Sequence, residues 1–139
     1  METLVDASKH MGTKLGKSWL MAISAGGPAG FRFLGESPGH FQGLISIASA
    51  PWPDQIHLQD KNARILMLNG AKDDRFPVDQ VRRLATQLKK RVPQLDYQEL
   101  PADHFFMLTM RQETFQYMRD FMKTRSKKTV QPKPKSKHP

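Results

Sequence analysis

The amino-acid sequence predicts an α/β protein in which about four mostly parallel strands form one sheet, with flanking helices in a three-layer arrangement. Apolar runs of strand length alternate with helical segments along the chain, and this order is typical of a parallel sheet with crossover helices. Polar or glycine-rich turns separate these runs. The length of 139 residues suits one domain with a modest core.

Four segments have the composition of strands. Residues 18–24 (SWLMAIS) form a nearly continuous apolar run, which predicts a central strand buried on both faces. Residues 41–49 and 63–69 predict a second and a third strand, and residues 96–100 predict a short fourth strand.

Helical segments alternate with these strands. A Gly-rich turn at residue 25 leads into a short helix that ends near residue 35. A second helix begins at Pro77, and residues 105–123 predict a final amphipathic helix. The apolar positions expected to face the core are Val81, Leu84, Ala85, Leu88 and Val92 in the second helix, and Met107, Met110, Phe115, Met118 and Met122 in the last.

The formal net charge of +9 is concentrated at the C-terminal end. Residues 123–139 contain seven basic residues, three prolines and no acid, which leaves about +2 for residues 1–122. We therefore predict a domain over residues 1–122 and a basic, disordered tail over residues 123–139. We interpret the tail as solubilising. The alternative is that it contacts nucleic acid or an anionic membrane through charge attraction.

Composition excludes several classes of function. The sequence contains no cysteine, so disulfides, thiolate metal sites and cysteine nucleophiles are excluded, and we predict no metal and no cofactor. No run of about eighteen apolar residues exists, so no transmembrane segment is expected. The N-terminus has no signal-peptide pattern, which favours a cytoplasmic location.

A serine stands between the first predicted strand and its helix, in the sequence AISAGG of residues 22–27. This segment resembles the nucleophile elbow of α/β-hydrolases, Gly-x-Ser-x-Gly, with Ala22 in place of the first glycine. The elbow exposes its serine on a strained turn and needs small neighbours, as Gly26 and Gly27 are. The resemblance implies that Ser24 is a nucleophile and that the backbone N–H of Ala25 donates to an oxyanion. The alternative is an ordinary Gly-rich turn with a capping serine.

A second motif, GAKDDRFP at residues 70–77, follows a predicted buried strand and precedes a helix. It resembles the acid-bearing turn of the same family, in which the aspartate comes three residues after a glycine and four residues before a proline. This spacing selects Asp73, and a shift of the turn by one residue would select Asp74 instead. Taken alone, the segment is also compatible with a polar turn whose aspartate caps the helix.

A third motif, LPADHFF at residues 100–106, resembles the histidine loop of the family and places His104 directly after the fourth predicted strand. The Ser, Asp and His residues occur in the chain order of α/β-hydrolases, each at the C-terminal end of a predicted strand. The remaining histidines, expected to be exposed, are His10, His40, His57 and His138.

The combined resemblance implies a serine hydrolase of small-molecule carboxylic esters or thioesters, similar to esterases of the phospholipase/carboxylesterase or dienelactone-hydrolase kind. Ser24, His104 and Asp73 would act as nucleophile, base and acid through an acyl-enzyme. Four aromatic side chains would line an acyl pocket or simply belong to the core: Trp52, Phe76, Phe105 and Phe106.

The resemblance covers about the last half of an α/β-hydrolase. The strands that precede the nucleophile in the family, and the loop that supplies its second oxyanion donor, have no counterpart in the chain. We therefore expect one bare sheet edge, to be covered by a missing segment or by a partner. The alternative function is a truncated, inactive hydrolase-like domain.

Overall fold

The computed structural model describes residues 9–12, 16–56, 58 and 62–124. It contains one four-stranded parallel sheet in the order β1-β2-β3-β4, as the sequence predicts. The strands are β1 (Ser18–Ile23), β2 (Phe41–Ile47), β3 (Arg64–Gly70) and β4 (Leu95–Leu100). The helices are α2 (Gly27–Glu36), α3 (Val78–Lys89), α4 (Phe106–Thr109) and α5 (Arg111–Lys123), with short 3-10 turns η1 (Ser24–Gly26) and η2 (Pro53–Ile56).

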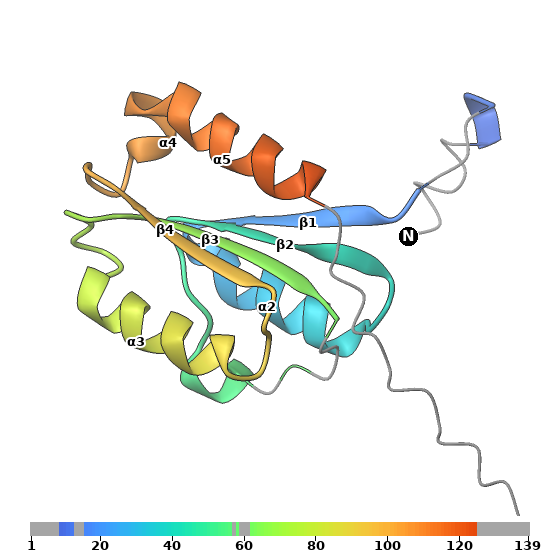
Figure 1. Ribbon diagram of the computed structural model, residues 1–139, viewed down its shortest axis with the longest axis horizontal. Coiled ribbons are helices and arrows are strands. Elements are labelled where there is room, and N and C mark those ends of the chain that lie inside the picture. The colour runs from blue at the N-terminus through green and yellow to red at the C-terminus, as the bar shows by residue number, and fades with distance from the viewer. Residues whose placement is uncertain (1–8, 13–15, 57, 59–61, 125–139) are drawn as a thin grey trace, which may run out of the picture.

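Helices cover both faces of the sheet, so the molecule has three layers. Helices α2 and α3 lie on one face, and α4 and α5 lie on the other (Figure 1). The predicted tail begins at Lys123, and all of it beyond Thr124 lies outside the described residues.

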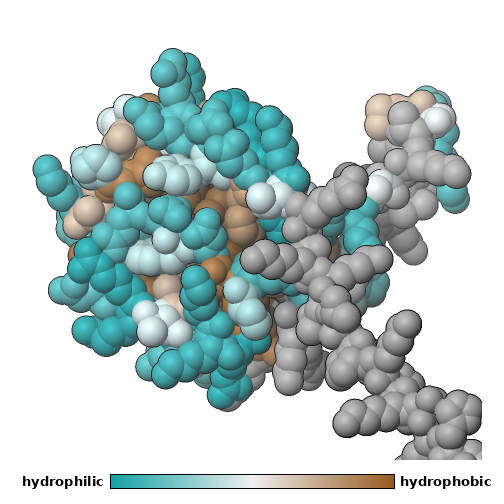
Figure 2. Space-filling view, viewed as in Figure 1, coloured by the Kyte–Doolittle hydropathy of each residue, from teal (hydrophilic) through white to brown (hydrophobic). Residues whose placement is uncertain are grey.

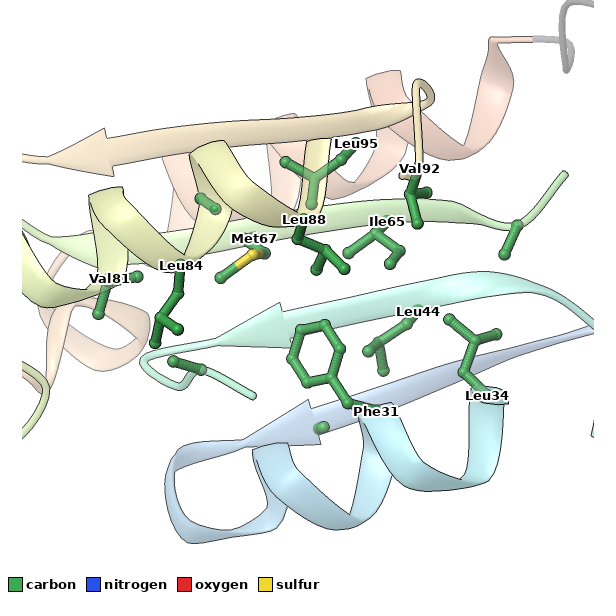
Figure 3. Close-up of a cluster of buried hydrophobic side chains, with 14 residues drawn as sticks. Phe31, Leu34, Leu44, Ile65, Met67, Val81, Leu84, Leu88, Val92 and Leu95 are labelled. Carbon is green, nitrogen blue, oxygen red and sulfur yellow. The ribbon is translucent and has the colours of Figure 1, made fainter. Parts of the chain in front are cut away.

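Each side of the sheet has its own apolar cluster. In β3, Ile65 and Met67 belong to the cluster beneath α2 and α3, whereas Leu66 and Leu68 belong to the cluster beneath α4 and α5. Figure 3 shows Phe31 of α2 and Leu88 of α3 packed over the first of these faces. Every residue of β3 is buried, because helices cover both of its faces and a strand pairs with each of its edges.

On the outer surface, the face seen in Figure 2 is largely hydrophilic.

The prediction that residues 18–24 form a central strand buried on both faces is wrong. β1 is an edge strand that pairs only with β2, and only Ala22 in it is buried. The side chains of Met21 and Ile23 are 52% and 43% exposed. An apolar run predicts burial only when a neighbour is present to bury it, and β1 has no such neighbour on its outer edge among the described residues.

The last helical segment is broken in two, whereas the sequence predicts one continuous helix. The break is at Met110, where φ is −121° and ψ is 46°. The inner face of α5 then follows Thr114, Met118 and Phe121, a spacing of four and three residues that lies on one side of a helix. Phe115 and Met122 of the predicted stripe are both 37% exposed, because the new helix starts in a different phase.

A buried arginine fastens the end of α5 to the sheet. The guanidinium of Arg64 packs over the rings of Trp19 and Phe121, at 5.2 and 4.5 Å from their centroids. Its Nη2 donates hydrogen bonds to the carbonyl of Phe121 and, at 2.7 Å, to Oγ1 of Thr124. Burial lowers the pKa of Arg64, but the C-terminal carbonyls of α5 favour a cation at this position. β1, β3 and α5 are thereby held together at the end of the sheet where the strands begin.

We expect the bare edge of β1 to make the full chain self-associate, because unpaired backbone groups flanked by apolar side chains are a template for further strand pairing. The change Met21→Lys should shift the chain toward monomer, as measured by sedimentation velocity over a concentration series. Phe33→Lys is the matched control, since Phe33 is 57% exposed but lies on α2. An equal effect of both changes would show that general surface apolarity, and not the edge of β1, drives the association.

Candidate active site

Three polar residues meet at the edge of the sheet where the parallel strands end. Ser24 directly follows β1, Asp73 lies in the turn after β3, and His104 lies in the loop after β4. Because all four strands run in the same direction, these loops emerge at one edge, which is where open α/β sheets place their sites.

Contacts between side chains link the three residues in a row. Oγ of Ser24 lies 2.8 Å from Nε2 of His104, and Nδ1 of His104 lies 2.8 Å from Oδ2 of Asp73. Oδ1 of Asp73 accepts hydrogen bonds of 2.9 Å from the backbone N–H groups of Arg75 and Phe76. Asp73 and His104 are both 6% exposed. Protein atoms therefore surround the carboxylate and the imidazole on nearly every side.

The structure brings Asp73, and not Asp74, to the imidazole. Asp74 is exposed, whereas Asp73 is buried against His104. The helix-capping alternative does not apply to α3 either, because the residue before its first turn is Pro77 and no side chain caps it. The amide bonds to Asp73 form within its own turn, a local arrangement that aspartate favours.

Aromatic rings hold the imidazole of His104 in place. The ring of Phe76 stacks on it with centroids 5.8 Å apart and planes 9° apart. The ring of Phe105 meets it edge-on, at 5.5 Å and 87°. The ring orientation of His104 therefore depends on packing as well as on its two polar partners.

Ser24 has a strained backbone. Its φ of +50° lies in the left-handed region, which costs a non-glycine residue about 1–3 kcal/mol. Ser49, fully buried just after β2, donates a hydrogen bond of 2.6 Å from its Oγ to the carbonyl oxygen of Ser24. This bond supports the turn from the neighbouring strand, and sequence reasoning did not find Ser49 because a single serine after a strand has no distinctive pattern.

Close packing of α2 against the sheet depends on two glycines. A Cβ atom on Gly27 would lie 1.6 Å from Oγ of Ser49, and one on Gly30 would lie 2.6 Å from Cβ of Ala22. A Cβ on Gly26 would meet nothing within 4 Å. The sequence indicated correctly that a small residue is needed at Gly27. Gly26, in contrast, has room for a side chain, and the need for a glycine at Gly30 was not predicted.

A cavity of about 360 Å³ lies next to the row of three residues, since its lining includes the residue after Ser24 and the ring that stacks on His104, although none of the three lines it. Ala25, Trp52 and Phe76 are among the residues that line it. Phe105 is not in its lining and instead contacts His104. Phe106 is fully buried in the cluster beneath α4 and α5, where it belongs to the core.

The described residues form no metal centre. No group of three or more His, Asp or Glu side chains in this part of the chain is arranged to hold a metal ion. His10 and His40 are exposed, and His57 and His138 lie outside the described residues. No described helix is both long and apolar enough to cross a membrane.

Comparisons with known proteins identify the fold. No protein-family model matches the chain, and no curated protein matches it. Solved structures do match, among them a predicted CIB-like hydrolase from Thermoplasma acidophilum (20% identity, TM-score 0.62) and an α/β serine hydrolase homologue from Coxiella burnetii (20% identity, TM-score 0.61). The esterase PE8 matches at 16% identity with a TM-score of 0.65.

The chain has a partial α/β-hydrolase fold. The matches to these three structures include 85–87% of this chain but only 55–56% of theirs. The chain thus spans a little over half the length of the α/β-hydrolases it matches. At 20% identity or less, the likeness establishes the fold alone.

The two adjacent glycines that follow Ser24 and Ala25 should respond differently to substitution. We expect Gly27→Ala to destabilise the chain by about 1–3 kcal/mol or more, because the new methyl group would overlap Ser49 in a packed region. Gly26→Ala should change stability by less than about 0.5 kcal/mol. Urea unfolding followed by circular dichroism measures both. A Gly27→Ala variant as stable as the wild type would contradict the tight contact with Ser49.

Proposed function

We propose that the chain carries the catalytic residues of a serine hydrolase that cleaves carboxylic esters or thioesters through an acyl-enzyme. The observation that carries this proposal is the pair of 2.8 Å contacts joining Ser24 to His104 and His104 to Asp73. The names of the structural neighbours, which include hydrolases and an esterase, support the same class of reaction.

In the first half of the reaction, Oγ of Ser24 attacks the carbonyl carbon of the substrate while Nε2 of His104 accepts the hydroxyl proton. Asp73 stabilises the imidazolium that forms and keeps Nδ1 protonated. The negative oxygen of the tetrahedral intermediate accepts a hydrogen bond from the backbone N–H of Ala25, next to the start of α2. The alcohol or thiol then leaves and takes its proton from His104.

In the second half, water attacks the acyl group on Ser24. His104 removes one proton from this water and returns it to Oγ of Ser24 as the acid departs. The proton balance is closed, because each proton that His104 accepts is given up within the same half-reaction. No metal ion or redox step is needed.

A second candidate function is a hydrolase-like domain that is inactive by itself. The observation that favours it is the edge strand β1, whose Met21 and Ile23 are exposed beside Ser24. An α/β-hydrolase site uses at least two oxyanion donors, and Ala25 supplies one. Loss of one donor lowers the rate by about two to three powers of ten. A chain in which the three residues are well arranged can therefore still hydrolyse its substrate slowly.

A fluorophosphonate probe tests the nucleophile without requiring a known substrate. We expect the full-length chain to be labelled at Ser24, with the modified residue located by peptide mass spectrometry. Ser24→Ala should abolish labelling. Ser37→Ala should leave it unchanged, since Ser37 only ends α2. If folded wild-type chain takes up no probe, Ser24 is not an activated nucleophile and the inactive-domain candidate is favoured.

The role of Asp73 can be tested with a matched neighbour. We expect Asp73→Asn to slow fluorophosphonate labelling by about 10⁴-fold, because an amide at this position favours the wrong tautomer of His104. Asp74→Asn should label at nearly the wild-type rate, because Asp74 is exposed and makes no contact with the imidazole. Comparable losses in both variants would indicate a general charge effect and would overturn the assignment of Asp73.

A further inference from the structure

The lining of the cavity is apolar apart from two side chains, of which one is charged. Of the twelve described residues that line it, ten are apolar, and the other two are Gln80 and Arg75. The apolar lining comes from Trp52 and the prolines around it, from Phe76, and from Val81 and Leu84 of α3. A volume of about 360 Å³ lies in the range of small-molecule pockets.

Arg75 is exposed, and its charge has no acidic partner among the described residues. Its guanidinium lies 5.1 Å from the ring centroid of Phe105, a cation–π contact. Among the described residues, no carboxylate forms an ion pair with this side chain. Arg82 on α3 shows the contrast, since it is paired with Glu99 at 2.5 Å and with Asp79 at 3.0 Å.

The aspartates of the two loops that carry Asp73 and His104 form no ion pair with Arg75. Asp73 accepts its bonds from His104 and from two backbone N–H groups. Asp103 accepts one from the backbone N–H of Phe105, and Asp74 is exposed. Phe105 connects the guanidinium of Arg75 to His104, because its ring contacts both. Arg75, which forms no ion pair within the described part of the chain, therefore lies between the cavity and the row of three residues.

We propose that the cavity takes the apolar part of an ester that also carries a carboxylate, and that Arg75 binds this carboxylate. The inference rests on the proposed function for its ester chemistry. An arginine pairs with a carboxylate through two parallel hydrogen bonds and remains charged at any relevant pH. Binding a neutral ester of the same shape would leave that charge without an anion. The site should therefore select for charge as well as for size.

The carboxylate has two sources, the acyl group or the leaving group. One pair of probes tests each source. Monomethyl adipate, which carries the charge on the acyl side, is compared with the neutral dimethyl adipate. 4-(Butanoyloxy)benzoate, which carries the charge on the leaving group, is compared with its neutral methyl ester. The members of each pair differ only by one esterified carboxyl group. The pair with the larger preference for its charged member identifies the side of the substrate that Arg75 reads.

Binding can be measured apart from catalysis. The full-length chain with Ser24→Ala binds without turnover by the proposed nucleophile. Because the sequence contains two tryptophans, adding Trp19→Phe leaves Trp52 as the only one, and its fluorescence reports occupation of the cavity. We expect at least one charged probe to bind about tenfold tighter than its neutral partner, with the preference declining in 0.5 M NaCl as the charges are screened.

The variant Arg75→Gln should abolish this tenfold preference, and Arg75→Lys should retain part of it. Arg83→Gln is the matched control, because Arg83 is exposed on α3 outside the cavity, and it should retain the full preference. Circular dichroism confirms that each variant folds. Equal binding of charged and neutral probes, or an unchanged preference in Arg75→Gln, overturns the proposal. If the preference holds but fluorophosphonate labelling fails, the carboxylate site stands and the hydrolase function falls.

Discussion

The structure depends on the parallel pairing of β2 with β3, both buried between the helical layers. The central residues of both strands carry buried apolar side chains on both faces of the sheet, so each face must be covered by a helix layer. Leu44, Ile65 and Met67 lie on one face, and Ile45, Ile47, Leu66 and Leu68 lie on the other. Parallel pairing then requires a crossover after every strand, and the crossovers bring the strand ends to one edge. Ser24, Asp73 and His104 lie in the loops at that edge, although 80 residues separate the first from the last.

The backbone is locally strained at this edge of the sheet, and specific contacts offset the strain. Ser24 and Ala48 both have φ near +50°, and each such residue costs about 1–3 kcal/mol. The hydroxyl of Ser49 bonds to the carbonyl of Ser24, and the absence of a side chain at Gly27 leaves room for that hydroxyl. The orientation of the serine is therefore set jointly by the end of β1, the end of β2 and the first turn of α2.

β1 has one edge that is not paired with another strand in the described structure. Ser24, the nucleophile of the proposed reaction, directly follows this strand, which has a strand on only one side in the described structure. Its pairing with β2 and the anchoring of Trp19 by Arg64 hold it at the sheet. Positioning of Ser24 thus depends on one edge of β1, while the other edge is free to bind a further strand.

Local patterns in the sequence determined the order of elements, the parallel sheet and the helix with Val81, Leu84 and Leu88 on its inner face, because strand and helix periodicities are properties of neighbouring residues. The resemblance of three short motifs to those of α/β-hydrolases pointed to Ser24, Asp73 and His104, each at the end of a predicted strand. Tertiary structure removed the alternative of Asp74, which a shift of the turn by one residue had left open beside the Asp73 that the spacing selects. It also decided that β1 is an edge strand, that Met110 breaks the last helix, and that Ser49 and Arg75 border the site. Each of these depends on which segments lie next to one another in space, and periodicity along the chain does not record that.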